Sequence, residues 1–557
     1  MIRSMLLVRL VGMTLGRAPA QEALNRPERK FCDGRVSESS IYRLLAERCH
    51  ELFADEKFAD LFRNVGRCSV PPRIVAVVMV LQRIEGLSDR EAVDRFTFDL
   101  RWKYASGVAH DYPEFVHTVL VDMRARLRDS ERPNRIFDTT LEVARTAGLI
   151  GRKRVLDSTA LYDAVATQDT VTMVRSAIRN VLRAADAAMV AQVRVVLKRD
   201  DDYLTPGKPK CEWDEKEARE ALIDALARDA FVVLAYLDGR AIEGDLAEAA
   251  KVLSAVTGQD IEQRDDKVFR ILRGVAADRI ISTVDPEARH GHKTAARGFD
   301  GFKGHIAVDP DSEIITATEV TAGNVGDAAA AKDLLEEVLG STSDDSSAND
   351  QPEEPAPAQE LKERPDAQPD SDGLVEVFGD ASYGSADLVE HIESKGAVAN
   401  VKVQPPTSRD GQFAQDAFHI DADAGTVTCP AGQLVQLRRG NDGYGRAEFG
   451  PRCDDCPQRH LCTTSKTGRV VNVHPKHNTL ARSRARQRDP EFKRVYKATR
   501  PKVERKISHM MRRRHGGRRS RMRGRLRTAQ DFALLAAAVN LSRLAALKTP
   551  VTAAQIR

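Results

Sequence analysis

Two aspartates lie at apolar segments that are far apart in the chain. Asp157 is in the β-branched and apolar run RKRVLDSTAL, residues 152–161, and Asp380 follows Gly379 in GLVEVFGDASYGS. Both runs predict buried strands that present the carboxylate at the strand end. Carboxylates at adjacent strand ends could hold hard divalent cations such as Mg²⁺ or Mn²⁺, which take few protein oxygens and keep other positions for water and phosphate.

Glu504, in RPKVERKISHMM, is the best candidate for a third acid. Pro501 suits the first position of a helix, which would place Glu504 in the first turn, where the helix dipole favours a carboxylate. Val503, Ile507 and Met510 would then give the helix an apolar side next to Glu504. We expect that side to turn the carboxylate toward the sheet.

Each acid also has a structural interpretation. Asp157 could cap a turn, Asp380 could belong to an Asx-turn, and Glu504 could be solvated or pair with a neighbouring arginine. The combined placement at two strand ends and on one helix favours a metal site over these alternatives.

A rival for the first acid is Asp285, in DPEARHGHK, residues 285–293. It too precedes a predicted strand, and His290, His292 and Lys293 follow it. These basic neighbours are more typical of phosphate contacts, so a structural turn is the favoured interpretation of Asp285.

Eight cysteines in 557 residues are too few for a disulfide scaffold, and four of them lie within one short segment. This favours a reducing, cytoplasmic compartment. Cys453 and Cys456 form a Cys-x2-Cys pair, and with Cys429 and Cys462 they could hold a structural Zn²⁺. The alternatives are four reduced thiols in an irregular insert, or His460 as a substitute ligand. The scattered cysteines are expected to be ordinary buried residues: Cys32, Cys49, Cys68 and Cys211.

Charge is separated along the chain, although 86 Lys plus Arg nearly balance 82 Asp plus Glu. Residues 504–527 hold 11 basic residues and one acid, whereas residues 341–373 hold 10 acids and two bases. The basic run could neutralise a DNA backbone or could simply be solvated. The residues expected to contact DNA are Arg512, Arg513, Arg514, Arg518, Arg519, Arg521 and Arg523, with Lys293 and Lys303.

The chain is long enough for about four domains, and no apolar run predicts a membrane span. The first residues faintly resemble a secretory signal, but Arg9 interrupts the apolar stretch, so we expect an extension. We predict an extension over 1–36, helices over 37–150, a catalytic domain over 151–340 and 374–403 with a helical insertion at about 165–280, a disordered linker over 341–373, a cysteine-rich insert over 404–490, and helices over 491–547.

Within these segments, residues that typically begin or end helices and turns predict particular elements. A helix should follow Pro71-Pro72 and end at Gly86, and a second should begin at Ser88. Residues 299–321 predict a hairpin, and a Thr-x-x-Asp cap at Thr528 should begin the last helix. The order strand, insertion, hairpin, helix, strand, helix, strand is that of an α/β ribonuclease-H-like domain.

Several short sequence motifs, taken in chain order, resemble those of a known family. LDSTAL, DPEARHGHK, FDGFKGHIAVD, TAGNVGD, GDASYGS and RPKVERK resemble the successive blocks of bacterial insertion-sequence transposases of the DDE type. SVPPRIVAVVMVLQRIEGLSDREA, residues 69–92, resembles their amino-terminal helical domain. The four-cysteine insert resembles the group numbered eleven eighty-two. The resemblance covers residues 37–545.

The resemblance implies that Asp157, Asp380 and Glu504 are the metal-binding triad. Tyr496 and Arg500 resemble the Tyr and Arg that accompany the final Glu, although the gap between them is one residue longer than usual. Met511 stands where that family has a lysine, which leaves Lys506 or Arg512 as possible substitutes.

We therefore expect a transposase that binds the terminal inverted repeats of its element, cleaves DNA with Mg²⁺ or Mn²⁺, and joins the 3′ ends to target DNA by a two-metal mechanism. It would act in the cytoplasm, associated with the nucleoid, as a homodimer on paired ends. The helical segment 37–150 would bind the ends, or would only pack or dimerise. The alternatives are an inactive DNA-binding relic or regulator, and a metal-dependent nuclease that does not join.

Overall fold

The computed structural model describes residues 13–18, 27–163, 165–294, 296–340, 373–408 and 411–548. The predicted acidic linker lies outside these residues except for Gly373, and so does most of the predicted amino-terminal extension. No helix in the described ranges is long and apolar enough to cross a membrane.

The amino-terminal segment is helical, as its helix start and stop residues predict. Its elements are α1 (Pro27–Asp33), α2 (Ile41–Leu52), a 3₁₀ helix (Asp55–Leu61), α3 (Pro72–Glu85), α4 (Asp89–Phe98), α5 (Leu100–Ala105), α6 (Thr118–Arg128) and α7 (Arg135–Thr146). Helix α3 ends at Gly86 with φ of 70°, and Ser88 forms a capping box with Glu91 at the start of α4. Both predicted boundaries are confirmed.

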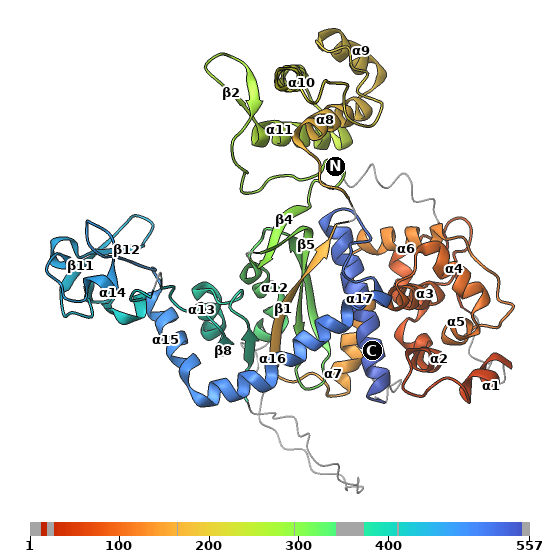
Figure 1. Ribbon diagram of the computed structural model, residues 1–557. Coiled ribbons are helices and arrows are strands. Elements are labelled where there is room, and N and C mark those ends of the chain that lie inside the picture. Colours follow the sequence, from red (N-terminus) through yellow and green to blue (C-terminus); the bar gives the residue numbers. More distant parts are fainter. Residues whose placement is uncertain are drawn as a thin grey trace, which may run out of the picture.

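Strands from three parts of the chain form a central sheet (Figure 1). They are β1 (Lys153–Tyr162), β4 (Arg289–Thr294), β5 (Arg297–Val308), β6 (Ile315–Ala322), β7 (Glu376–Gly379) and β8 (Val398–Val401). The order is β4-β5-β1-β7-β8, and β6 pairs with β5. Strand β1 is antiparallel to β5 and parallel to β7, which is parallel to β8. The predicted hairpin is β5–β6.

Alternation along the strands divides the sheet into two faces. Leu156, Ala307 and Val377 pack against α12 (Ala331–Gly340), which follows the 3₁₀ helix Asp327–Ala330, and against α13 (Ala386–Ser394). Val155 and Phe378 face the other way, against α16 (Pro490–Met510) and α17 (Arg525–Ala546). Helix α16 runs across this face in Figure 1.

The amino-terminal helices share a core with this second face of the sheet, because α17 packs between them. Arg83 of α3 is 3.1 Å from Asp531 of α17, and both residues are buried. Helix α17 begins after Gly524 with no side-chain cap, so the Thr-x-x-Asp cap predicted at Thr528 is wrong. Thr528 lies inside the helix and is buried.

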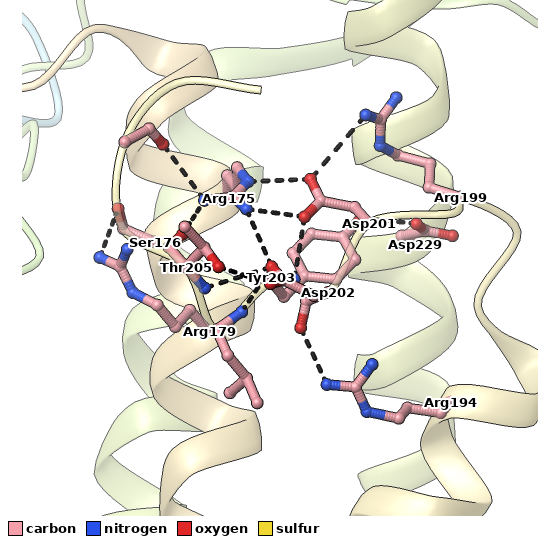
Figure 2. Close-up of polar contacts among 12 residues, drawn as sticks. Arg175, Ser176, Arg179, Arg194, Arg199, Asp201, Asp202, Tyr203, Thr205 and Asp229 are labelled. Carbon is pink, nitrogen blue, oxygen red and sulfur yellow. Dashed lines mark hydrogen bonds and ion pairs between the residues drawn. The ribbon is translucent and has the colours of Figure 1, made fainter. Parts of the chain in front are cut away.

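The insertion after β1 has a separate core. It contains α8 (Thr170–Ala184), α9 (Ala187–Val196), α10 (Lys216–Leu237) and α11 (Gly244–Asp260), followed by a hairpin, β2 (Ile261–Gln263) and β3 (Phe269–Ile271), that the sequence analysis did not predict. Figure 2 shows how a loop is fixed to these helices: Arg175 contacts Asp201 at 2.7 Å, and buried Tyr203 donates to Asp229 at 2.6 Å.

The cysteine-rich segment forms a five-stranded antiparallel sheet with a small core. Its strands are β9 (His419–Asp421), β10 (Thr426–Thr428), β11 (Leu434–Arg439), β12 (Gly445–Glu448) and β13 (Val470–Val473), and α14 (Arg459–Cys462) lies between the last two. Helix α15 (His477–Arg488) then leads to α16. The segment is therefore not irregular.

The buried pair of Arg83 and Asp531 gives a stability prediction. Asp531→Ala leaves the Arg83 guanidinium buried with the carbonyl of His515 as its one remaining acceptor among the described residues, so we expect the free energy of unfolding to fall by about 3–5 kcal/mol. Chemical denaturation measures this change. Asp129→Ala, which removes the more exposed partner of Arg128, is the control and should change stability by less than about 1 kcal/mol. Equal effects would contradict the structural role of the buried pair.

Candidate active site

Asp157 and Asp380 come from neighbouring parallel strands. Val155 of β1 is in register with Phe378 of β7, so the two aspartates lie two residues farther along their chains at the same level of the sheet. The prediction that β1 ends at Asp157 is wrong, because Ser158 and Thr159 continue its pairing with β5. Asp380 does follow directly after β7, as predicted.

Arg500 of α16 lies between these two carboxylates. Its Nη2 is 2.9 Å from Asp157 Oδ1 and 3.4 Å from Asp380 Oδ2. One turn earlier, Tyr496 donates a hydrogen bond to the carbonyl of Gly379 at 3.2 Å. Arg500 is 7% exposed, and its Nη1 is buried without a hydrogen-bond partner in the part of the chain that the structure describes. Nη1 of Arg500 is therefore a buried donor without an acceptor among the described residues.

The electrostatics follow from burial and from this contact. Burial raises the pKa of Asp157, the hydrogen bond and charge of Arg500 act against that change, and the negative charge of Asp380 adds to it. Burial alone would lower the pKa of Arg500, but its hydrogen bond to Asp157 and the charges of both aspartates raise it. The guanidinium is therefore charged wherever the protein is folded.

Glu504 lies inside α16 and is exposed. The helix begins at Pro490, where Asp489 accepts a hydrogen bond from the backbone N–H of Glu491, so Pro501 is internal. The prediction that Glu504 occupies a first turn is wrong, and the helix-dipole argument for it fails with it. Its spacing of four from Arg500 and eight from Tyr496 places all three on one helix face.

Other features of α16 agree with the sequence. Val503 and Met510 are buried and Ile507 is half-buried, which confirms the predicted apolar side. The negative charge of Glu504 contributes to the raised pKa of Tyr496, for which burial is the largest cause. Lys506 is buried 3.7 Å from Glu313, and burial lowers its pKa to about 8.

Among the described residues, no three His, Cys, Asp or Glu side chains are arranged so that they could hold a metal ion. At the aspartate pair, Arg500 rather than Glu504 completes the cluster. The donors nevertheless suit a hard divalent cation, because they are carboxylate oxygens on adjacent strands. The unpaired Nη1 of Arg500 also suits an anionic partner such as a phosphate oxygen.

The four cysteines of the insert line one cavity of about 20 Å³, which His460 does not line. Backbone N–H groups donate to the sulfur atoms of Cys429 and Cys453 at 3.3 and 3.4 Å. The described residues contain no recognised metal-binding group, so zinc is unsupported here. Of the scattered cysteines, Cys32 and Cys49 are buried as predicted, whereas Cys211 is half-buried and Cys68 is exposed.

The backbone of the arginine-rich loop, residues 511–524, is tied to several parts of the fold. The backbone N–H of Tyr162, at the end of β1, donates to the carbonyl of Arg518 at 2.8 Å, and the backbone carbonyl of Tyr162 accepts from the N–H of Ser520 at 2.7 Å. The N–H of Gly524 donates to the buried carboxylate of Asp285 at 2.9 Å. This contact agrees with the structural interpretation favoured for Asp285.

The side chains of this loop differ in how much they are engaged. Arg521 is half-buried and donates to the carbonyl of Leu87, and Arg514 is exposed and contacts the His515 ring at 3.3 Å. The others are exposed and form no ion pair with any described residue: Arg512, Arg513, Arg518, Arg519 and Arg523. Five guanidinium groups are thus available to an anionic surface.

The two lysines expected to contact DNA differ in exposure. Lys293 is exposed. Lys303 is mostly buried, 2.8 Å from Asp327 and 2.8 Å from the carbonyl of Val325. Sequence reasoning missed Asp327 as its partner, although the residue lies in the block TAGNVGD. Lys303 is therefore engaged within the protein, unlike the exposed arginines of the loop.

Two segments of the chain match known family models. Residues 30–126 match a family described as a transposase domain (DUF772), and residues 428–545 match one described as a transposase DDE domain. The second segment contains Arg500 and Glu504, whereas Asp157 and Asp380 lie outside both. No curated protein and no solved structure matches the chain.

A DDE domain generally implies a divalent metal such as Mg²⁺ and an enzyme of the polynucleotidyl transferase or nuclease type. The mixed α/β architecture is consistent with that domain. The two matched segments, one at each end of the chain, together support a transposase of the insertion-sequence type.

Proposed function

We propose that the protein cleaves DNA at the ends of its insertion sequence and joins the freed 3′ ends to target DNA, at a centre formed by Asp157, Asp380 and Glu504. The observation that carries the proposal is the contact of one arginine with two carboxylates from adjacent parallel strands. Bound Mg²⁺ or Mn²⁺ would activate a water or a 3′ hydroxyl of the DNA as the nucleophile and would stabilise the leaving oxygen.

The residues of the site suit this chemistry. Asp157 and Asp380 offer oxygens to the cation, and Glu504, on the helix face that carries Arg500, would complete the set. Arg500 balances the charge of the aspartates and has a buried Nη1 that still requires an acceptor. We infer that this nitrogen donates to a phosphate oxygen of bound DNA, and that Tyr496 positions Arg500 by anchoring α16 at Gly379.

A ribonuclease-H-like fold is the proposed architecture. Its support is the sheet order, in which the antiparallel strands β1, β5 and β6 are followed by the parallel strands β7 and β8. One candidate acid lies on β1 and the next directly after β7, so the topology brings them together despite the long insertion between β1 and β4. The third candidate acid, Glu504, lies on α16, which crosses the face of the sheet that carries Val155 and Phe378.

The basic surface is proposed to hold the DNA. The exposed arginines of the 511–524 loop and Lys293 would contact phosphates, and the helical segment 37–150 would bind the terminal repeats. The fixed backbone of the loop supports this role, because it holds the guanidinium groups beside the end of β1. We also propose that the protein acts in the cytoplasm as a homodimer on paired DNA ends.

Zinc at the four cysteines is a separate proposal, and the zinc content of the purified protein tests it.

Two alternatives use the same surface. An inactive DNA-binding relic or regulator would keep the basic loop without the chemistry, and a nuclease would cut without joining. The presence of all three acids favours catalysis over decay. Only detection of joined products distinguishes a transposase from a nuclease.

Replacement of the third acid tests the centre. Glu504→Gln removes one carboxylate charge while leaving the basic loop intact, so cleavage of a duplex that carries the terminal repeat should be lost while binding to that duplex is unchanged. Gel assays with Mg²⁺ measure both. Glu491→Gln, an exposed change on the same helix, is the control. Wild-type cleavage by Glu504→Gln would remove Glu504 from the site.

Salt dependence tests the loop. The double variant Arg518→Ala/Arg519→Ala should lower the slope of log affinity against log salt concentration by about 2, because each phosphate contact contributes nearly one unit. Fluorescence anisotropy between 50 and 200 mM salt, as is usual for such titrations, measures the slope. Arg438→Ala, an exposed change in the cysteine-rich segment, should leave it unchanged. An unaltered slope in the double variant would contradict the proposed DNA surface.

A further inference from the structure

A fully buried tyrosine extends from the Asp380 turn into the opposite side of the sheet. The Tyr383 hydroxyl is 3.1 Å from Nδ1 of His305 on β5, and the two rings are nearly perpendicular. Nε2 of the same histidine is 2.9 Å from the Thr321 hydroxyl on β6. These three side chains form a chain of hydrogen bonds from the turn to the antiparallel part of the sheet.

Burial keeps His305 neutral within this chain of hydrogen bonds. Burial lowers its pKa to about 4, although the charge of Asp327 acts against the change, and Lys303 adds to it. The ring is therefore neutral near neutral pH, with one nitrogen donating and the other accepting. Either ring nitrogen can be the donor, so the chain of hydrogen bonds runs from Tyr383 through His305 to Thr321 or in the reverse direction.

The turn that carries Tyr383 has little conformational freedom. The N–H of Tyr383 donates to the carbonyl of Asp380 at 3.1 Å, and the N–H of Ser382 donates to its carboxylate at 2.9 Å. A Cβ at Gly384 would lie 2.1 Å from the carbonyl oxygen of Lys402. Ser385 caps α13. Movement of Tyr383 would consequently displace the backbone that carries Asp380.

The same face of the sheet also anchors β1. Ser158, the residue after Asp157, is in register with His305. Its hydroxyl donates to Asp327 at 2.6 Å, and Lys303 contacts the second oxygen of that carboxylate. Both aspartate-bearing segments are thus held by buried or half-buried polar contacts on the face opposite Arg500.

We propose that Tyr383, His305 and Thr321 are positioning residues that hold Asp380 at a fixed distance from Asp157, so that both carboxylates reach one divalent cation. The inference rests on the proposed function. In this proposal, none of the three residues contacts the metal or the DNA. They act through Asp380, as residues that orient metal ligands do elsewhere.

Mn²⁺ binding tests the inference without catalysis. Tyr383→Phe keeps the ring and removes the hydroxyl, so Mn²⁺ affinity of the metal-free protein, followed by electron paramagnetic resonance of free Mn²⁺, should fall by about 10–100-fold. DNA affinity in EDTA should not change. Tyr444→Phe, an exposed tyrosine in the cysteine-rich segment, is the matched control and should bind Mn²⁺ like wild type.

A second pair of variants covers the case in which Tyr383→Phe does not fold. Thr321→Val removes the hydroxyl that His305 contacts and should weaken Mn²⁺ binding, whereas Thr321→Ser retains it and should restore wild-type affinity. Wild-type affinity in both Tyr383→Phe and Thr321→Val would overturn the inference, provided that Asp157→Asn loses Mn²⁺. If Asp157→Asn binds Mn²⁺ like wild type, the proposed metal centre itself is wrong.

Discussion

The contact of Arg500 with Asp157 and Asp380 is the constraint around which the site is arranged. Two carboxylates on adjacent strands repel each other, and burial makes the charged form of Asp157 less favourable still. A guanidinium on α16 offsets both effects. For this to happen, the helix must cross the sheet at the level of the aspartates, and Tyr496 and Val503 hold it there.

The same constraint explains why distant parts of the chain depend on one another. The amino-terminal helices and the α17 helix share a core with the face of the sheet that carries Asp157. The arginine-rich loop joins α16 to α17 and is tied to α3 through His515 and Arg83. The segments that match the two transposase families therefore pack together, and the basic surface is fixed relative to the aspartates.

Much of this arrangement was predictable, because local signals encode it. The Pro71-Pro72 start and Gly86 end of α3, the capping box at Ser88 and the β5–β6 hairpin all follow from residue types at short spacing. Asp380 was placed correctly because Gly379 and the following turn end the apolar run. The three candidate acids are proposed from their segments and from a family resemblance.

The errors arise where tertiary contacts override local signals. Ser158 and Thr159 suggested a strand end, but pairing with β5 carries β1 on to Tyr162. Pro501 suggested a helix start, but buried Tyr496, Arg500 and Val503 hold the helix on both sides of it. Lys303 looked available for DNA, and its partner Asp327 is 24 residues away. No single-sequence pattern reports such pairings.

Strand joining tests whether Asp157 and Asp380 form a metal-dependent centre. Purified protein is incubated with a short duplex carrying the element's terminal repeat, a supercoiled plasmid and Mg²⁺, and joined products are counted for wild type and for Asp157→Asn. We expect joined products for wild type and none for the variant. A wild-type protein that binds the duplex but never cuts or joins it with Mg²⁺ or Mn²⁺ would show that Asp157 and Asp380 do not form such a centre.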